Sequence, residues 1–321
     1  MEPGKSFGKY VLLKRIAAGG MGEVYLAQKR GPRGFSMPVA IKVILPYLGS
    51  SQRFTEMFFN EAQLAAQLNH PNIVRVYDFG LIEETYFIEM EYVQGENLAT
   101  IIDELARRKA RLPDFFAAKI GIDVCKGLDY AHTKRDDLSG KPLNIIHRDI
   151  SPQNILISYG GEVKITDFGI AKRADDQKTK GGMLKGKYSY MSPEQVLSNA
   201  LDKRSDIFSL GVVLYEMVTG VRPFDRRSDY LTLEAIKSAP VPPMQKFGVE
   251  VDASFEAIVA RALAKDPAER FPSARVFRRE LEAYLQERHR RPTTIDLDTF
   301  LHDMFEEKIA EKEAIKLLSQ A

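Results

Sequence analysis

The hydrophobic period of the chain changes near Leu98. Up to that point apolar residues mostly alternate with polar ones, which is typical of half-buried strands. The exception is residues 51–68, where apolar residues recur at three- and four-residue intervals, as in an amphipathic helix. The alternating stretches are Tyr10–Ile16, Glu23–Gln28, Val39–Leu45 and Thr85–Met90. From Ala99 onward the helical period dominates, so the pattern predicts a β-rich region with one helix and then a mainly helical region.

Four helices and two short strands are predicted in the second region. The helical patterns cover Leu112–His132, Ser205–Thr219, Ser254–Ala264 and Ser273–Glu287, and the strand signals cover Ile155–Ile157 and Val163–Ile165. Residues 289–321 form a charged tail with one apolar helical face, made by Leu297, Phe300, Leu301, Met304 and Phe305. A helix packed on the parent domain is the favoured interpretation of this tail, and contact with a second copy or another partner is the alternative.

Charge and cysteine content limit the classes of function. Lys plus Arg (46) nearly balances Asp plus Glu (44), so the net charge of +2 gives no broad field of the kind that binds nucleic acid. Cys125 is the only cysteine, which excludes an intrachain disulfide and fits a reducing compartment. The longest apolar stretch is too short to span a bilayer. We therefore expect a cytoplasmic chain with no membrane segment and no nucleic-acid partner.

Glu61 places a carboxylate on the apolar face of the helix predicted at residues 51–68. An unpaired buried carboxylate costs several kcal/mol, so a cation must lie at the same depth. Lys42 is the best candidate, because it lies in the apolar strand Val39–Leu45 on the face opposite Ile41 and Val43. Taken alone, the pair could be purely structural.

A glycine-rich turn, residues 17–24, joins two predicted strands. Glycines let backbone amides approach a phosphate closely. A dinucleotide fold needs a helix after the glycines, whereas Val24–Leu26 alternates as a strand, so the turn is interpreted as a hairpin lid. Residues 181–187 match a phosphate-binding GxxxxGK pattern, but Tyr188 stands where that motif needs Ser or Thr, and no apolar strand precedes it.

Two acidic side chains and one amide follow apolar segments in the middle of the chain. Asp149 and Asn154 lie in the polar run after Ile145 and Ile146, and Asp167 follows the strand Val163–Ile165. Carboxylate and amide oxygens suit Mg²⁺ bound to nucleotide phosphates, and a separate carboxylate can orient a hydroxyl nucleophile. The combination is a specific signal.

In their order and spacing, these motifs resemble those of the bacterial eukaryotic-like Ser/Thr protein kinases of the Hanks type. The resemblance covers roughly Tyr10–Leu285. The sequence of residues 19–25 is similar to bacterial kinases, and that of residues 149–154 is similar to a variant found in myxobacterial kinases. The motifs that carry it are Gly19–Val24, Val39–Lys42, His147–Asn154, Asp167–Gly169 and Ser192–Glu194.

The resemblance implies an α+β, two-lobed protein-kinase fold, with a small antiparallel β-sheet lobe that holds one helix and a larger, mainly helical lobe. The divisions it implies are an N-terminal lead at 1–9, the N-lobe at 10–90, a hinge at 91–97, the C-lobe at 98–288 and a helical tail at 289–321.

The resemblance also implies roles for individual residues. Lys42 binds the α and β phosphates of ATP, and Glu61 orients Lys42. Asn154 and Asp167 bind Mg²⁺, for which Mn²⁺ can substitute. Asp149 positions the acceptor hydroxyl. The residues implied around the rest of the nucleotide are Ala17, Gly19, Gly20 and Gly22 in the lid, Val24 and Ala40 on the two faces of adenine, the gatekeeper Met90, and the backbone of Glu91 and Val93 at the adenine edge.

Three positions depart from the family pattern. Ala17 replaces the first lid glycine, Ser151 replaces the lysine two residues after the catalytic aspartate, and Lys187 replaces a threonine after Gly186. Because the family places that threonine close to the lysine, we hypothesise that Lys187 supplies the charge missing at Ser151. The alternative is a surface lysine without a role.

Other implied features are supports and regulatory positions. Asp206 anchors the backbone of the catalytic loop and Glu194 pairs with Arg270. Arg148 allows a phosphate on the activation segment to organise the site, with Thr179 and then Ser189 as acceptor candidates. Cys125, His70 and His132 are interpreted as structural, and residues 136–143 as a surface loop.

The function implied is transfer of the γ-phosphate of ATP to Ser or Thr hydroxyls of proteins, including the chain itself, in bacterial signalling. Tyrosine acceptors are less favoured. The resemblance leaves room for a homodimer that autophosphorylates in trans. Two alternatives stay open: a nucleotide-binding pseudokinase that acts as a scaffold, which Ser151 favours, and a small-molecule phosphotransferase.

Overall fold

The computed structural model describes residues 4–19, 22–45, 52–168 and 188–318. The chain divides into two compact units. A small unit comprises Met1–Val93 with Phe168–Arg173, and a large unit comprises Gln94–Asp167 with Ala174–Ala321.

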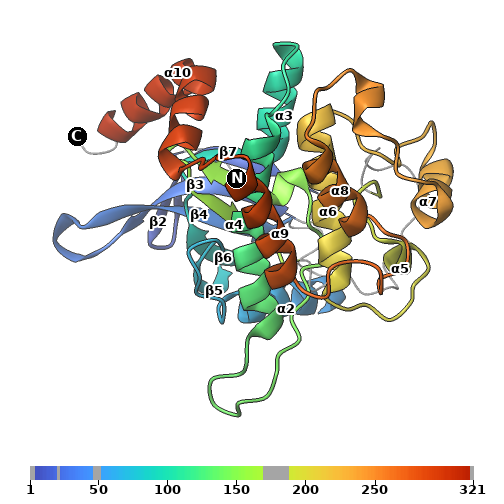
Figure 1. The fold of residues 1–321 in the computed structure, drawn as a ribbon. Coiled ribbons are helices and arrows are strands. Elements are labelled where there is room, and N and C mark those ends of the chain that lie inside the picture. The colour runs from blue at the N-terminus through green and yellow to red at the C-terminus, as the bar shows by residue number, and fades with distance from the viewer. Residues whose placement is uncertain (1–3, 20–21, 46–51, 169–187, 319–321) are drawn as a thin grey trace. The chain divides into compact units, whose positions relative to one another are not determined.

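The small unit contains an antiparallel sheet with the strand order β1-β2-β3-β4-β6-β5 (Figure 1). One face buries an aromatic and aliphatic core that includes Tyr10, Tyr25 and Ile41. Helix α2 packs on β5 and β6, where the Phe59 ring centroid lies 5.8 Å from that of Phe79 on β5 and 5.0 Å from that of Tyr86 on β6. The bounds are β1 (Ser6–Phe7), β2 (Tyr10–Ala18), β3 (Gly22–Arg30), β4 (Ser36–Ile44), α2 (Gln52–Ala65), β5 (Val76–Ile82) and β6 (Thr85–Glu91).

Strand β1 lies within the segment that we expected to be an N-terminal lead. Ser6 and Phe7 pair with Val11 and Tyr10 of β2. The Phe7 side chain is buried and packs edge-on against Phe87, with ring centroids 5.8 Å apart. These first residues therefore contribute to the core of the small unit.

The large unit is mainly helical, with a small sheet in the order β7-β8-β9. Helix α6 is buried along almost its whole length, and α4 packs against both α6 and α9 (Figure 1). The four predicted helices are present as α4, α6, α8 and α9, with ends that agree closely. The bounds are β7 (Gly95–Asn97), α3 (Leu98–Arg107), α4 (Asp114–Thr133), β8 (Ile155–Ser158), β9 (Val163–Ile165), α5 (Pro193–Val196), α6 (Arg204–Thr219), α7 (Asp229–Ser238), α8 (Ala253–Ala262), α9 (Ala274–Glu287) and α10 (Thr294–Leu318).

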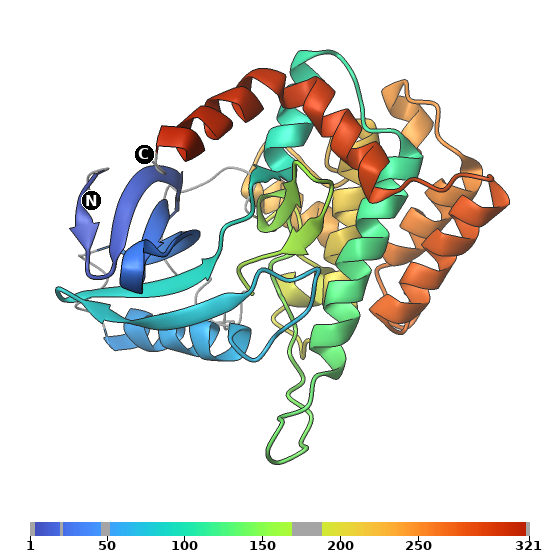
Figure 2. The same ribbon diagram turned by 90° about the vertical axis from the view of Figure 1, so that its left-hand side faces the viewer.

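The C-terminal tail forms α10, which packs within the large unit as the favoured interpretation predicts. Phe300 packs against Phe116 of α4, with tilted rings whose centroids lie 5.1 Å apart. The helix bends at Phe305, where the backbone leaves helical geometry (Figure 2), and Arg108 donates to the carbonyl of Met304 just before the bend. A carbonyl close to the break in the helix thus has a side-chain donor.

Among the described residues, no helix combines the length and the apolar character that crossing a bilayer requires.

Candidate active site

Lys42 and Glu61 form the ion pair that the sequence predicts in the small unit. The Lys42 Nζ lies 2.8 Å from Glu61 Oε1, and each side chain is 15% exposed. Strand β4 positions the lysine, because its pleat turns Ile41 and Val43 to the core and Lys42 to the other face. Helix α2 supplies the glutamate. The pair fixes the ammonium at the end of a long side chain, which prepares it to bind an anion.

The glycine-rich turn joins β2 to β3. Gly19 N–H donates to the carbonyl of Gly22 at 2.8 Å, which closes the turn. A Cβ on Gly22 would lie 2.2 Å from the Val43 carbonyl oxygen, so the sheet itself requires glycine there. Among the residues that the structure describes, a Cβ on Gly19 would meet no atom closer than 3.9 Å. Packing therefore does not require glycine at position 19, and close approach of a ligand would explain it. Gly20 lies outside the described residues.

The other residues expected around adenine lie on paired strands of the small unit. Ala17 pairs with Val24 across β2 and β3, and Ala40 pairs with Met90 across β4 and β6. Glu91 N–H donates to the carbonyl of Arg75 at 2.8 Å. Val93 is the last residue of the stretch Met1–Val93 of the small unit.

The catalytic-loop residues meet in the large unit. Asn154 Nδ2 donates to the backbone carbonyl of Asp149 at 2.8 Å and to its Oδ2 at 3.1 Å. Thr166 N–H donates to the Asn154 carbonyl at 3.0 Å, which ties the loop to the segment that ends in Asp167. Asp167 has a φ of 54°, a left-handed conformation that is costly for a residue other than glycine. Two acidic residues and the amide of Asn154 are therefore linked by backbone and side-chain hydrogen bonds.

Asp206 of α6 holds the catalytic loop by accepting hydrogen bonds from its backbone N–H groups. Its Oδ1 accepts the N–H of Arg148 at 2.8 Å, and its Oδ2 accepts the N–H of His147 at 2.8 Å. His132 Nε2 lies 2.8 Å from the same Oδ2. Burial alone would raise the pKa of Asp206, but the hydrogen bond and charge of His132 and the contacts of His147 hold it below its ordinary value. The anchor that the family resemblance implies is present.

Side-chain oxygens in the large unit are of the type that binds a hard divalent cation. The Asn154 NH₂ group points at Asp149, which leaves its amide oxygen for another partner. Together with the Asp167 carboxylate, this gives oxygen ligands of the type that Mg²⁺ prefers, and nucleotide phosphates would complete the shell. Among the described residues there is no group of three or more His, Cys, Asp or Glu side chains suited to a metal.

Glu194 and Arg270 form the buried pair that the resemblance implies. Arg270 donates to both carboxylate oxygens, at 2.7 and 2.8 Å, and Ser205 donates to Oε1 at 2.7 Å. The remaining guanidinium donors reach the carbonyls of Arg204, Ala264 and Lys265. Burial alone would raise the pKa of Glu194, but Arg270 and Ser205 hold it below its ordinary value. The pair ties α5 to the segment around Arg270.

Two other predictions concern the activation segment. Lys187 and Thr179 lie outside the described residues. Ser189 is 1% exposed and its hydroxyl donates to Asp225 Oδ1 at 2.7 Å, so it is not accessible as a phosphate acceptor in this structure.

Two polar groups contact the supports of the site. His132 was interpreted as structural, which agrees with its contact with Asp206, although the sequence did not name that partner. Gln195 was not singled out, and its Nε2 donates to the Arg148 carbonyl at 2.9 Å. Both contacts join segments far apart in the sequence, so no local pattern could have shown them.

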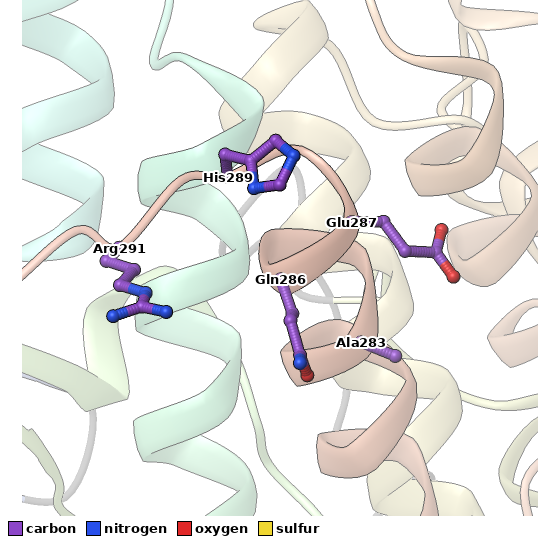
Figure 3. A pocket seen from close by; sticks show the side chains of 5 residues that line it. All are labelled: Ala283, Gln286, Glu287, His289 and Arg291. Carbon is purple, nitrogen blue, oxygen red and sulfur yellow. The ribbon is translucent and has the colours of Figure 1, made fainter.

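A hollow of about 730 Å³ lies at the end of α9 (Figure 3). Its lining residues belong to that helix and the segment after it: Ala283, Gln286, Glu287, His289 and Arg291. None of the candidate catalytic or nucleotide-binding residues lines it.

An antiparallel sheet whose lysine pairs with a glutamate of the packed helix, followed by a helical unit that carries the aspartate–asparagine loop, is typical of the protein-kinase fold. The chain belongs to the protein kinase domain family, whose model matches residues 10–281. The predicted α+β kinase fold is therefore confirmed.

Relatives are bacterial kinases. Tyrosine-protein kinase MasK of Myxococcus xanthus is 41% identical over 315 residues, which cover 98% of this chain and 49% of MasK. Serine/threonine-protein kinase PknB of Mycobacterium leprae is 38% identical over 85% of this chain and 42% of its own length. The chain thus spans half or less of these curated relatives. A crystal structure of the Mycobacterium tuberculosis PknI kinase domain matches with a TM-score of 0.65 and 29% identity, over 88% of this chain and 99% of that one.

Proposed function

We propose that the chain is an active protein kinase domain that transfers the γ-phosphate of ATP to Ser or Thr hydroxyls of proteins. The observation that carries this proposal is the Asp149–Asn154 arrangement. One carboxylate is held by an amide donor at 3.1 Å, on a loop whose backbone is fixed from α6. This is a pre-positioned acceptor for the proton of a hydroxyl nucleophile.

The other residues would bind and orient the nucleotide. Lys42, held by Glu61, would bind the α and β phosphates, and Asn154 and Asp167 would hold Mg²⁺ or Mn²⁺. A bound Mg²⁺ bridges phosphate oxygens and neutralises charge on them. Loose phosphoryl-transfer transition states demand chiefly alignment and charge, which these side chains supply without a covalent intermediate.

The lid and the adenine site would be formed by the small unit. Backbone amides at Gly19, Gly20 and Gly22 would approach the phosphates, with Ala17 at the start of the lid. Val24 and Ala40 would contact the two faces of adenine. Met90 would be the gatekeeper, and the backbone of Glu91 and Val93 would bind the adenine edge.

The acceptor specificity rests on the relatives. PknB and several other bacterial relatives are named as serine/threonine kinases, whereas MasK is named as a tyrosine kinase. We propose Ser and Thr as the acceptors, because the relatives named for them are the more numerous of those compared.

An acceptor panel tests the proposal. The purified chain is incubated with labelled ATP and Mg²⁺, and with protein substrates that offer Ser and Thr, Tyr-only peptides, or small hydroxyl compounds. We expect label on protein Ser or Thr, and loss of labelling when EDTA removes the metal. Label on small compounds alone would favour the small-molecule phosphotransferase, and label on tyrosine alone would reassign the acceptor.

A pseudokinase is the second candidate function. Ser151, which is 8% exposed, stands where Ser/Thr kinases commonly place a lysine, so a positive charge near the transferring phosphate is missing. Nucleotide binding without labelling of any acceptor in the panel would support this function and exclude the first.

We also propose that Lys187 supplies the charge missing at Ser151. Removal of its ammonium in Lys187→Ala is expected to lower kcat, because the transferring phosphate loses a cation, while the KM for ATP changes little. Steady-state rates of parent and variant measure this. Lys164→Ala, on β9, is a control for loss of a lysine elsewhere in the large unit. Equal turnover of parent and Lys187→Ala would exclude the exchange of charge.

Cellular location and assembly are further proposals. The near balance of charges and the single, buried Cys125 support a cytoplasmic site for this part of the chain. Two copies could autophosphorylate in trans, and the dependence of the autophosphorylation rate on protein concentration tests this.

A further inference from the structure

Arg148 holds a backbone conformation that needs external support. Its φ is 66°, in the left-handed region that is costly for side chains other than glycine. Arg148 directly precedes Asp149, so its carbonyl belongs to the peptide group whose nitrogen is that of Asp149. Whatever fixes this peptide therefore sets the direction from which the Asp149 side chain leaves the loop.

The two ends of Arg148 are held by different elements. Its N–H donates to Asp206 Oδ1 of α6, at 2.8 Å. Its carbonyl accepts Nε2 of Gln195 of α5, at 2.9 Å. Asp206 thus holds the peptide before Arg148, and Gln195 holds the peptide after it.

Gln195 also closes the start of α5. Its Oε1 accepts the N–H of Ser192 at 2.9 Å, while its own N–H donates to Ser192 Oγ at 3.3 Å. This reciprocal arrangement is a capping box, in which glutamate serves as well as glutamine. The helix therefore needs only the oxygen of the side chain. The NH₂ group, which distinguishes glutamine from glutamate, is directed at Arg148.

We propose that Gln195 is a positioning residue for phosphoryl transfer, which holds the Arg148–Asp149 peptide and so orients Asp149 from α5. The inference rests on the proposed kinase function. It assigns the two ends of one amide group separate tasks: the oxygen caps α5, and the nitrogen holds the catalytic loop. Because α5 follows the activation segment in the chain, the orientation of Asp149 then depends on α5 being in place.

Gln195→Glu separates the two tasks. The carboxylate keeps the capping oxygen and suits a helix N-terminus, but it cannot donate to Arg148 and places negative charge against its carbonyl. We expect kcat to fall by about 10- to 100-fold, since small displacements of catalytic groups cost rates of this order. The KM for ATP should stay within about twofold and the unfolding temperature close to that of the parent, because neither the nucleotide residues nor the cap is removed.

Ser192→Ala is the matched control, because it removes the capping hydroxyl and leaves Gln195 able to donate to Arg148. It is expected to lower the unfolding temperature by a few degrees and to keep kcat within about threefold of the parent. The proposal thus predicts that Gln195→Glu lowers kcat and keeps stability, whereas Ser192→Ala lowers stability and keeps kcat.

Three results would overturn the positioning role. The first is a Gln195→Glu variant with the kcat of the parent. The second is a Gln195→Glu variant whose rate falls only in proportion to lost folded protein. The third is needed if Gln195→Glu does not fold. Gln195→Ala and Ser192→Ala both lack the capping box, and an equal kcat of these two variants would then contradict the positioning role. A parent chain that labels no acceptor would instead overturn the proposed function itself.

Discussion

Replacement of Asp149 by asparagine is expected to lower kcat by about 10²- to 10⁴-fold, the range that general-base catalysis contributes. Asparagine has nearly the same shape and keeps an oxygen that can accept the hydrogen bond from Asn154 Nδ2, which lies 3.1 Å from Asp149 Oδ2. It lacks the negative charge that attracts the proton of the acceptor hydroxyl. Binding of ATP should therefore change by no more than about twofold, because the proposed nucleotide contacts lie elsewhere. Initial rates and direct titration with ATP measure the two effects separately.

Asp123→Asn is a suitable control for this variant. Asp123 is a buried carboxylate of α4 that pairs with Lys119 and, at 2.8 Å, with Lys126. Its replacement removes a buried charge from the same unit without touching the catalytic loop, so we expect lower stability and unchanged kcat. A kcat of Asp149→Asn within tenfold of the parent would mean that another group positions the hydroxyl.

The parts of the site that could be predicted from sequence are those that break a local pattern. Glu61 interrupts the apolar face of a helix and Lys42 interrupts an apolar strand, so each needs a partner at the same depth. Their pairing follows from the cost of burying charge, and the structure has it at 2.8 Å. Helices α4 and α6 were predicted closely for a different reason: each is a long, mainly apolar segment without an internal proline, and its length favours a helix over a strand.

Strands β1 and β5 were not predicted, for two physical reasons. β1 has only two residues, which is too short for any period to be recognised. β5 is an edge strand in which the apolar residues Tyr77, Phe79 and Leu81 stay partly exposed although α2 packs against this strand, so alternation there does not mark a fully buried face. A strand at the edge of a sheet can thus have an apolar pattern that does not indicate the core.

The supports of the catalytic loop could not be predicted from local patterns either. His132 and Asp206 are 74 residues apart, and Gln195 and Arg148 are 47 apart. Taken alone, His132, Asp206 and Gln195 are polar residues near helix ends, and Arg148 is a polar residue in a loop, so none of them stands out by its position. Only the fold brings these groups to the same loop, so their contribution to the site follows from the structure and from the family.

The largest effect on stability is expected at the Glu194–Arg270 pair. Arg270→Met removes the cation and leaves a carboxylate that is 8% exposed without its main partner. Breaking a buried ion pair in this way costs about 3–5 kcal/mol, because the remaining charge is neither solvated nor compensated. Thermal and chemical denaturation should show a lower free energy of unfolding for the large unit. Arg275→Met is the control: its partner is Asp129 at 3.0 Å and its side chain is 55% exposed, so a loss of at most about 1 kcal/mol is expected.

The pH dependence of this loss distinguishes the ion pair from simple packing. In the parent, the pKa of Glu194 lies below its ordinary value of 4.5, so the pair stabilises the fold fully above that pH. This stabilisation is lost as the pH falls through the folded-state pKa. In Arg270→Met the pKa of Glu194 should instead be raised by burial, so the carboxyl group becomes neutral earlier on acidification and its penalty disappears. The difference in unfolding free energy between parent and variant should therefore be largest near pH 7 and decrease towards pH 4. A difference that stays constant over this range would mean that Arg270 stabilises α5 through its packing and its carbonyl contacts, not through its charge.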